Sequence, residues 1–349
     1  MFIPKTYTVE SVTSGHPDKV CDQISDAILD ACLEQDPYTR AGVETFGNHG
    51  LLVIGGEVTT KADFDAEKIA KKVYSDIGYT KDLNIIKGIV KQSPDIAQGV
   101  DTGGAGDQGI MYGFATNETP EFMPSAIVKV HALARGLEDL RKSGEIKWLK
   151  PDGKTQITVF EDKIKTVLIS TQHDENIEQN EIKQVLTEKL IKSFIGDISG
   201  IEILVNPTGK FVMGGFSADT GLTGRKIMVD TYGGLISHGG GCFSGKDPSK
   251  VDRSAAYMAR FAAKNIVANG FAKKCLVSVS YAIGRVDPLM VEAISETGES
   301  LSDLVRNKFD FRPKSIIEKL DLLKPIYFKT ASYGHFGKAD LPWEKIVKL

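Results

Sequence analysis

The stretch HGGGCFSGKDPSKVDRS, from His238 to Ser254, separates two fold classes for this chain. From Gly240 it reads GGCFSGKD, which matches the phosphate-binding loop pattern G-x-x-x-x-G-K-[ST] up to its last position. Asp247 stands there, and a carboxylate cannot supply the hydroxyl that binds Mg²⁺ in a P-loop. The preceding residues LISHGGG are too short and polar for a buried strand. The stretch therefore predicts a phosphate-binding glycine turn outside a P-loop fold, with Asp247 and Pro248 beginning a helix.

On either side of this stretch, short apolar, β-branched runs alternate with helical patterns. GLLVIGGEVTT precedes a helical pattern over 65–77, KTVLIST precedes one over 177–194, and KCLVSVSYAIG precedes one over 301–308. Such alternation is typical of layered sheets and helices. We therefore expect a mixed α/β protein.

The clearest helix lies in HPDKVCDQISDAILDACLEQDP, which begins at His16. Its small and apolar residues recur with the helical period on one face, namely Cys21, Ile24, Ala27, Ile28, Ala31 and Cys32. Pro17 suits the first helical position, and Pro37 closes the segment. We expect both cysteines of this face to lie in the core.

The length of 349 residues exceeds what one small core usually serves, so two or three domains are expected. Glycine-rich seams in GVDTGGAGDQG and FVMGGFSADTGLTG divide the chain into thirds of similar size. We place the domains at 1–101, 102–215 and 216–349. The net charge of −3 argues against a general nucleic-acid-binding or membrane-binding surface.

The composition also indicates the compartment. No run of about 18 apolar residues is present to span a membrane, and MFIPKTYTVESV lacks the apolar core of a secretory signal. The four cysteines show no C-x-x-C spacing and no pairing pattern. Thiols of this kind are typical of a reducing environment, so we expect a cytoplasmic protein.

Three further clusters combine glycine with acid or base: SGHPDK (14–19), GAGDQG (104–109) and DTGLTGRK (219–226). Glycines let the backbone approach a ligand closely and turn N–H groups towards an anion. An acid beside such a turn suits a divalent metal, and a base suits phosphate. Together the clusters predict a site for polyphosphate and metal.

The residues of these clusters also have purely structural interpretations. His16 suits a helix N-cap, and Asp18 suits the dipole of the first helical turn. Arg225 and Lys226 suit the start of a solvated strand. From single residues alone, structural and ligand-binding interpretations both stay open.

Two lysines favour a ligand. Lys19 and Lys250 each lie at an expected helix N-terminus, where the dipole disfavours a cation. Each also lies close to an acid and a glycine turn. We therefore expect polyphosphate and a metal to supply the missing partner.

The motifs SGHPDK, GAGDQG and HGGGCFSGKD, in this order and at these separations, closely resemble those of S-adenosylmethionine synthetases (methionine adenosyltransferases). The likeness runs from Glu10 through PIYFKTASYGHFGKADLPWEK and covers nearly the whole chain. It implies synthesis of S-adenosylmethionine from ATP and L-methionine. The methionine sulfur would attack C5′ of ATP, and the released tripolyphosphate would be hydrolysed to pyrophosphate and phosphate. A thioether has no proton to lose, which agrees with the lack of an evident Ser-His-Asp or Cys-His arrangement.

The resemblance also implies roles for particular residues, matched through the family motifs. The catalytic positions are His16, Lys154, Arg225, Lys246 and Lys250. The ATP-binding positions are His16, Asp152, Lys154, Lys210, Phe211, Asp219, Arg225, Lys226, Cys242 and Lys246. The methionine-binding positions are Glu57, Gln98, Asp219 and Lys250, with Asp107 in support. The metal ligands are Asp18 and Asp252 for Mg²⁺ and Glu44 for K⁺.

The implied fold is α/β, of the α+β type. It has three similar domains with pseudo-threefold symmetry, mixed sheets covered by helices, and segments exchanged between domains. The implied cofactors are two Mg²⁺ and one K⁺ per site. The implied partner is a second copy of the chain, in a homodimer or a dimer of dimers whose active sites are shared between subunits. No nucleic acid or membrane partner is implied.

The sequence departs from the family pattern in two places. Only Gly99 to Gly103 separate Gln98 from Gly104, where many relatives carry several more residues that form a mobile lid. A shorter lid covers less of the methionine, so a looser thioether pocket is expected. Cys242 stands where relatives often have alanine.

Two other classes of function compete with the synthetase. The G-x-x-x-x-G-K match would suit a P-loop-type kinase or NTPase, which predicts phosphate transfer or ATP hydrolysis without methionine. A non-catalytic nucleotide-binding module would bind ATP without turnover. The scattered clusters of acid and base favour the enzyme.

Overall fold

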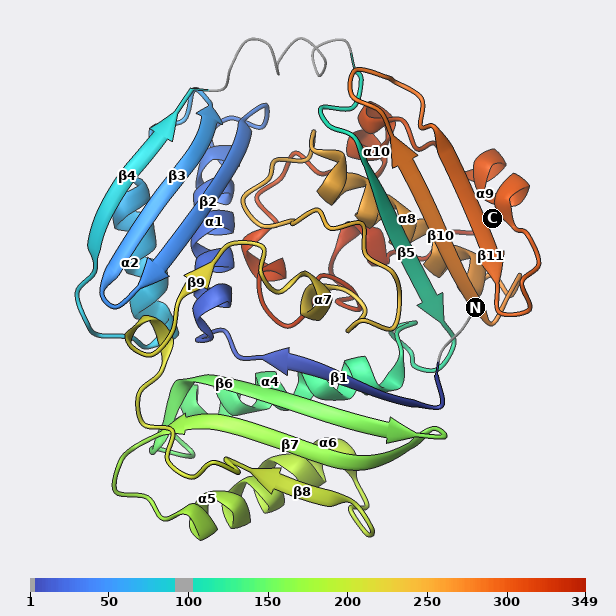
Figure 1. Cartoon of the computed structure of the whole chain (residues 1–349). Helices are drawn as coiled ribbons and strands as arrows, with labels where there is room; N and C mark the ends of the chain where they lie inside the picture. The colour runs from blue at the N-terminus through green and yellow to red at the C-terminus, as the bar shows by residue number, and fades with distance from the viewer. Residues whose placement is uncertain (1–3, 92–102) are drawn as a thin grey trace.

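The computed structural model describes residues 4–91 and 103–349 as a mixed α/β protein with three sheets (Figure 1). The first sheet has the order β1-β6-β7-β8, with β1 Thr6–Val12, β6 Leu149–Phe160, β7 Lys163–His173 and β8 Glu202–Val205. The second has the order β11-β10-β5, with β11 Met290–Ser295, β10 Lys274–Tyr281 and β5 Gly109–Thr116. The third has the order β4-β3-β2-β9, with β4 Asn84–Val90, β3 Leu51–Thr59, β2 Arg40–Asn48 and β9 Gly221–Leu222.

Each sheet takes one strand from a distant part of the chain. Strand β1 pairs with β6, β5 pairs with β10, and the short β9 pairs with β2. The pairs β3–β4 and β7–β8 are parallel and the others antiparallel, so the sheets are mixed. The expected exchange of segments is confirmed. The pseudo-threefold symmetry and the boundaries at 1–101, 102–215 and 216–349 stay predictions.

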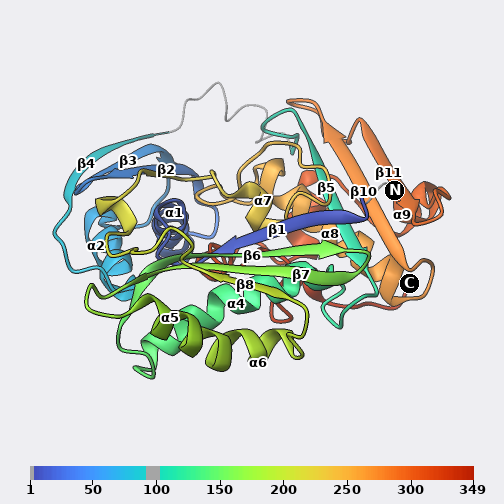
Figure 2. The ribbon, with the colours of Figure 1, turned by 60° about the horizontal axis from the view of Figure 1, so that its bottom comes forward.

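Helices cover one face of each sheet. Helices α1 (Pro17–Leu33) and α2 (Ala66–Ile77) pack on the third sheet. Figure 2 shows α4 (Ser125–Lys142), α5 (Gln179–Leu186) and α6 (Lys192–Ile195) beneath the first. Helix α8 (Val251–Ala268) crosses the second sheet, with α9 (Ser302–Lys308) and α10 (Pro313–Lys319) nearby. The helices expected over 65–77, 177–194 and 301–308 are confirmed, the middle one containing a π-helical turn at Thr187–Ile191.

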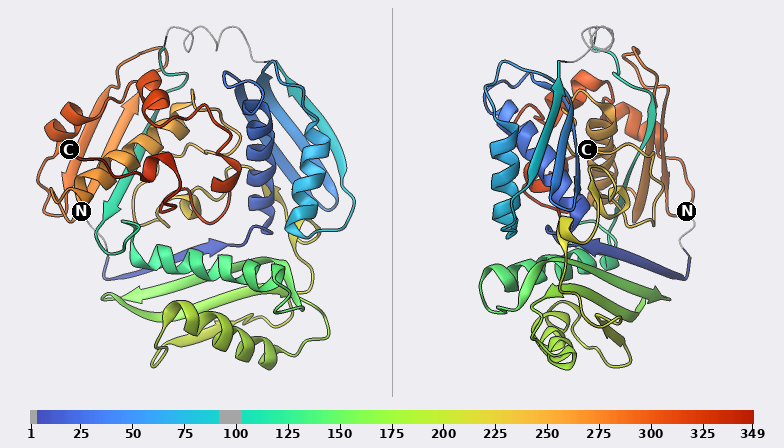
Figure 3. Two further views of the ribbon diagram at one scale, coloured as in Figure 1. Left: turned by 180° about the vertical axis from the view of Figure 1, so that it is seen from behind. Right: turned by 60° about the vertical axis from the view of Figure 1, so that its left-hand side comes forward.

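The C-terminal segment joins these layers. Seen from behind, residues 320–349 run between α1, α4 and α8 (Figure 3). The Tyr333 hydroxyl accepts a hydrogen bond from the Ser14 amide at 3.1 Å and donates one to Glu138 of α4. Trp343 and His335 are fully buried. One continuous hydrophobic core therefore extends through all three layers, and Cys21 and Cys32 lie in it as predicted.

The glycine turn is not a P-loop. Residues 231–243 contain no strand, so the strand–loop–helix order is absent there. The prediction that Asp247 and Pro248 begin the next helix is wrong, because α8 begins at Val251 with Lys250 as its N-cap. The Asp247 carboxylate instead accepts the amides of Ser249 at 2.9 Å and of Ala41 at 2.8 Å. It thereby joins the turn to β2 rather than capping a helix.

No helix within 4–91 and 103–349 is long and apolar enough to cross a membrane. Gln98 and most of the short segment that follows it lie outside the described residues.

Candidate active site

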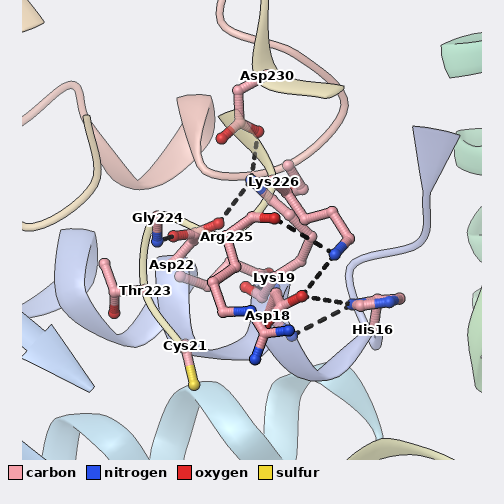
Figure 4. Close-up of polar contacts among 12 residues, drawn as sticks. His16, Asp18, Lys19, Cys21, Asp22, Thr223, Gly224, Arg225, Lys226 and Asp230 are labelled. Atoms are coloured by element: carbon pink, nitrogen blue, oxygen red, sulfur yellow. Dashed lines mark hydrogen bonds and ion pairs between the residues drawn. The ribbon is translucent and has the colours of Figure 1, made fainter. Parts of the chain in front are cut away.

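The N-terminus of α1 forms the first part of the site (Figure 4). His16 is the N-cap, and its Nδ1 accepts a hydrogen bond from the Asp18 amide at 3.2 Å. Burial, together with the positive charges of Lys226 and Lys154, lowers the pKa of His16 to about 2. The imidazole is therefore neutral, and because Nδ1 accepts, its proton is on Nε2. His16 therefore caps the helix through Nδ1 and carries its N–H on Nε2.

Asp18 lies close to the positive side chains of a loop some 200 residues away in the sequence. Its Oδ1 accepts the Leu222 amide at 2.9 Å, and its Oδ2 lies 2.5 Å from Lys226 Nζ. Arg225 Nε lies 3.9 Å from Oδ1. Lys154 of β6 lies opposite Val12 of β1 in register, and its positive charge lowers the pKa of His16. The structure thus brings together five predicted residues, called here the His16 cluster: His16, Asp18, Lys154, Arg225 and Lys226.

A second group, the Asp252 cluster, comprises Glu44, Asp107, Cys242, Lys246 and Asp252. Lys246 Nζ pairs with Asp252 in the first turn of α8. Burial would lower the pKa of Lys246, but Cys242 and Asp252 raise it overall, and Asp107 adds to this. Burial raises the pKa of the Cys242 thiol, and the negative charge of nearby Glu44 also raises it. The cluster is therefore a charged lysine among acids at the edge of the glycine turn.

Most of the predicted nucleoside residues lie near the ends of β6 and β7, whereas Cys242 belongs to the Asp252 cluster. Burial raises the pKa of Asp152 to about 6, and its Oδ2 accepts the Gly215 amide at 2.8 Å. Asp219, which is exposed, raises the same pKa and so lies nearby. The Phe211 amide donates to the His173 ring at 3.0 Å, which anchors the backbone of the segment containing the exposed Lys210. These contacts bring Asp152 and Asp219 together and anchor Phe211 beside the end of β7.

The predicted methionine residues are less well assembled. Glu57 lies on β3 opposite Gly42, and within residues 4–91 and 103–349 no hydrogen bond or ion pair joins it to either cluster. Asp219 Oδ1 accepts a hydrogen bond from the amide of its neighbour Thr220, at 2.7 Å. Gln98 cannot be placed, and Lys250 lies at the start of α8. These assignments stay predictions.

The reason for expecting ligands at Lys19 and Lys250 was wrong, because the protein supplies both counter-ions. Lys19 Nζ is fully buried, 2.5 Å from Asp230 and 3.0 Å from Asp22. Burial alone would lower its pKa, but these carboxylates raise it overall. Lys250 Nζ lies 2.7 Å from Asp247. A phosphate is thus not required to balance either lysine.

Sequence reasoning missed the acidic stripe of α1. Four aspartates in this helix accept hydrogen bonds from backbone amides of other segments, namely Asp18, Asp22, Asp26 and Asp30. Asp26 also pairs with the buried Arg253 at 2.7 Å. A signal was present in the letters, since aspartate recurs at every fourth residue of DKVCDQISDAILD. Attention to the apolar face of the same helix obscured it.

The donor set indicates how a metal would fit. No group of three or more His, Cys, Asp or Glu side chains is placed to hold a metal ion in the described part of the chain. Asp18 and Asp252 each offer a carboxylate beside a lysine. Mg²⁺ is commonly bound by one or two carboxylates together with substrate phosphates and water. The residues therefore fit Mg²⁺ that binds with a polyphosphate.

Comparison with known proteins identifies the family. Models of the N-terminal, central and C-terminal domains of S-adenosylmethionine synthetase match residues 4–96, 102–211 and 213–345. The chain belongs to the S-adenosylmethionine synthetase family. It is 53% identical to the S-adenosylmethionine synthase of Pseudothermotoga lettingae, over 98% of the chain and 96% of that protein. It is 51% identical to that of Sorangium cellulosum, over 97% of the chain and 87% of that protein.

Membership in the S-adenosylmethionine synthetase family confirms the resemblance found in the motifs and the enzyme class, methionine adenosyltransferase. The P-loop kinase alternative fails on separate grounds: residues 231–243 contain no strand, and Asp247 stands where the motif requires Ser or Thr after Lys246.

Proposed function

We propose that this protein makes S-adenosylmethionine from ATP and L-methionine by attack of the methionine sulfur on C5′ of ATP. Tripolyphosphate is released in this step and then hydrolysed to pyrophosphate and phosphate. The observation that carries the proposal is the His16 cluster, where lysine and arginine side chains surround a neutral donor at a helix N-terminus. A leaving group of roughly four negative charges needs preorganised cations of this kind.

The roles of the residues follow from their match to the family motifs. His16, neutral and protonated on Nε2, would donate a hydrogen bond near the junction of C5′ and the triphosphate. Lys154, Arg225, Lys226, Lys246 and Lys250 would neutralise the phosphates. Asp152, Lys210, Phe211, Asp219 and Cys242 would line the nucleoside. Glu57, Gln98, Asp219 and Lys250 would bind methionine, with Asp107 in support.

The ion pairs of both clusters are suited to exchange partners when substrate binds. Lys226 pairs with Asp18, and Lys246 pairs with Asp252. Polyphosphate oxygens would accept from these lysines, which frees each carboxylate for one of two Mg²⁺ ions. Bound Mg²⁺ supplies charge neutralisation of the leaving polyphosphate. Glu44, an exposed acid on β2, would hold K⁺.

The products test the proposal. With ATP, methionine, Mg²⁺ and K⁺, we expect methionine-dependent S-adenosylmethionine, and all three phosphates of ATP released as phosphate plus pyrophosphate. Mass spectrometry of the nucleoside product and separate assays for phosphate and pyrophosphate measure this. ADP as the main product would overturn the proposal in favour of phosphoryl transfer.

Removing a metal-binding carboxylate should shift the Mg²⁺ requirement. We expect Asp18→Asn and Asp252→Asn to need more Mg²⁺ for half-maximal activity, by about tenfold, because each loses one charge of an oxygen-ligand site. Titration of activity with Mg²⁺ at saturating ATP measures the shift. Glu175→Gln, at an exposed acid on the loop after β7, is the control that should leave it unchanged. An unaltered Mg²⁺ requirement in both aspartate variants would contradict the metal assignment.

The motif resemblance supports an active site that is shared between two subunits and uses both clusters. Their side-chain ion pairs are distinct, Lys226 with Asp18 and Lys246 with Asp252. Large apolar side chains are exposed on the strands, among them Ile86 and Val90 of β4 and Ile110 of β5. A homodimer, or a dimer of dimers, would bury such surface and combine the His16 cluster of one subunit with the Asp252 cluster of the other.

Mixing experiments test the shared site. We expect light scattering to give at least a dimer at assay concentration. An inactive variant of each cluster, Lys154→Ala and Lys246→Ala, should recover about a quarter of the parent activity after subunit exchange, because half of the dimers then carry one intact site. Two variants of the same cluster should recover none. A fully active monomer would contradict the shared site.

A further inference from the structure

One stripe of α1 carries an aspartate at every fourth residue, and each accepts a backbone N–H from a residue outside the helix. The spacing places them on one helix face, about 6 Å apart along the axis. The donors are Leu222 at 2.9 Å, Gly224 at 2.8 Å, Gly245 at 2.8 Å and Phe328 at 2.8 Å, for Asp18, Asp22, Asp26 and Asp30 respectively. Like charges at this spacing repel. The stripe therefore weakens the isolated helix and acts through its contacts with other segments.

Asp22 is the member beneath the basic loop 221–226. Its side chain is fully buried, and its Oδ1 accepts the Gly224 amide. Its Oδ2 lies 3.0 Å from Lys19 Nζ, which is also bound to Asp230 (Figure 4). Burial raises the pKa of Asp22 to about 7, so holding an ionised carboxylate here is costly.

Gly224 is held from its other side as well. Its φ is +78°, a conformation that favours glycine, and a Cβ there would lie 2.4 Å from Cys242 Cβ. The loop is thus confined between Asp22 and Cys242. Arg225 and Lys226 follow immediately, so the orientation of the Gly224 peptide sets where their side chains begin.

We propose that Asp22 is a positioning residue for the adenosyl-transfer reaction: by holding the Gly224 amide, it fixes Arg225 and Lys226 of the His16 cluster against α1. The Asp22 carboxylate is itself paired with Lys19, which also pairs with Asp230. This role presupposes the proposed function, because Arg225 and Lys226 matter only if they bind polyphosphate. Asp22 would thus contribute to the reaction without contacting substrate.

Asp30 provides a matched control on the same stripe. It accepts the amides of Tyr327 and Phe328, which lie outside both clusters. Burial raises its pKa to about 7, as for Asp22. Asp22→Ala and Asp30→Ala therefore each remove a buried carboxylate that accepts backbone amides. Only Asp22→Ala removes a contact to the basic loop.

The variants are compared by hydrogen exchange of 221–226 and 325–330, by calorimetric binding of inorganic tripolyphosphate with Mg²⁺, and by kcat and KM. For Asp22→Ala we expect exchange of 221–226 to rise, and tripolyphosphate binding and kcat to fall, each by about tenfold or more, the size of one lost hydrogen bond to a charged group. Asp22→Asn, which keeps an acceptor for Gly224 and leaves Lys19 paired with Asp230, should recover most of these losses.

Asp30→Ala should accelerate exchange of 325–330 only and leave tripolyphosphate binding within about twofold. If Asp22→Ala does not fold, Asp22→Ser, whose hydroxyl is too short to reach Gly224, carries the same expectations. Unchanged exchange of 221–226, or equal loss of tripolyphosphate binding in the Asp22 and Asp30 variants, would overturn the positioning role. A parent enzyme that makes no S-adenosylmethionine would instead overturn the proposed function, while the exchange data still judge Asp22.

Discussion

Lys154→Ala is expected to lower the rate of S-adenosylmethionine formation by about 100-fold, the usual effect of losing one stabiliser of transition-state charge. Lys154 lies exposed on β6, and in the described residues no ion pair holds it. Its charge nevertheless acts on His16 and Asp152. The loss should therefore appear in kcat, measured by product formation, with the melting temperature almost unchanged.

Lys163→Ala is the matched control. Lys163 is an exposed lysine of the adjacent strand β7, paired in register with Phe160 at the opposite end of the hairpin. It should retain parent activity. Equal activity in the two variants would show that Lys154 does not contribute to the site, and a large fall in melting temperature for Lys154→Ala would point to a structural role instead.

Arg260→Met is expected to destabilise the protein by about 3–5 kcal/mol, the usual cost of removing one partner of a buried ion pair. The Arg260 guanidinium is fully buried and 2.8 Å from Glu344. It also donates to the carbonyls of Phe114, Phe122 and Glu121, at 2.7, 2.8 and 2.7 Å. One side chain thereby joins α8, β5 and the C-terminal segment. Urea unfolding followed by circular dichroism measures the loss.

Arg306→Met serves as the comparison. Arg306 pairs with Asp303 and Glu292, but its own side chain is 45% exposed, and exposed pairs contribute about 0–1 kcal/mol. Glu344 also pairs with the buried Lys264 at 2.7 Å, so the double variant Arg260→Met with Glu344→Gln should not recover stability, because it leaves Lys264 without its carboxylate. A loss below about 1 kcal/mol in Arg260→Met would contradict the importance of this buried pair.

The sequence was sufficient wherever neighbouring residues decide the structure. The face of α1 that carries Cys21 and Cys32 is buried as its period predicts, because a helix places residues three and four apart on one side. The motif order alone indicated the family that the domain matches then established. His16 was recognisable as an N-cap, and the structure adds that its imidazole is neutral.

Local patterns failed where a partner comes from far along the chain. Lys19 seemed unpaired beside its helix terminus, yet it pairs with Asp22, three residues along, and more closely with Asp230, which is 211 residues away. That partner arrives because β9, only two residues long, pairs with β2 and carries the following loop onto α1. Asp247 looks like a helix cap in the sequence, because the Ala41 amide that it accepts lies 206 residues away.

The sequence by itself thus determined the helices, the buried face of α1, the family and the identity of the charged residues. Only the tertiary structure decided which charges neutralise one another, and hence that Lys226 and Lys246 lie against Asp18 and Asp252 while Lys19 is sealed inside. The physical reason is that secondary structure depends on residues within a turn or two, whereas the energy of a charge depends on burial and on every nearby partner. In this fold the exchange of strands between sheets sets those partners.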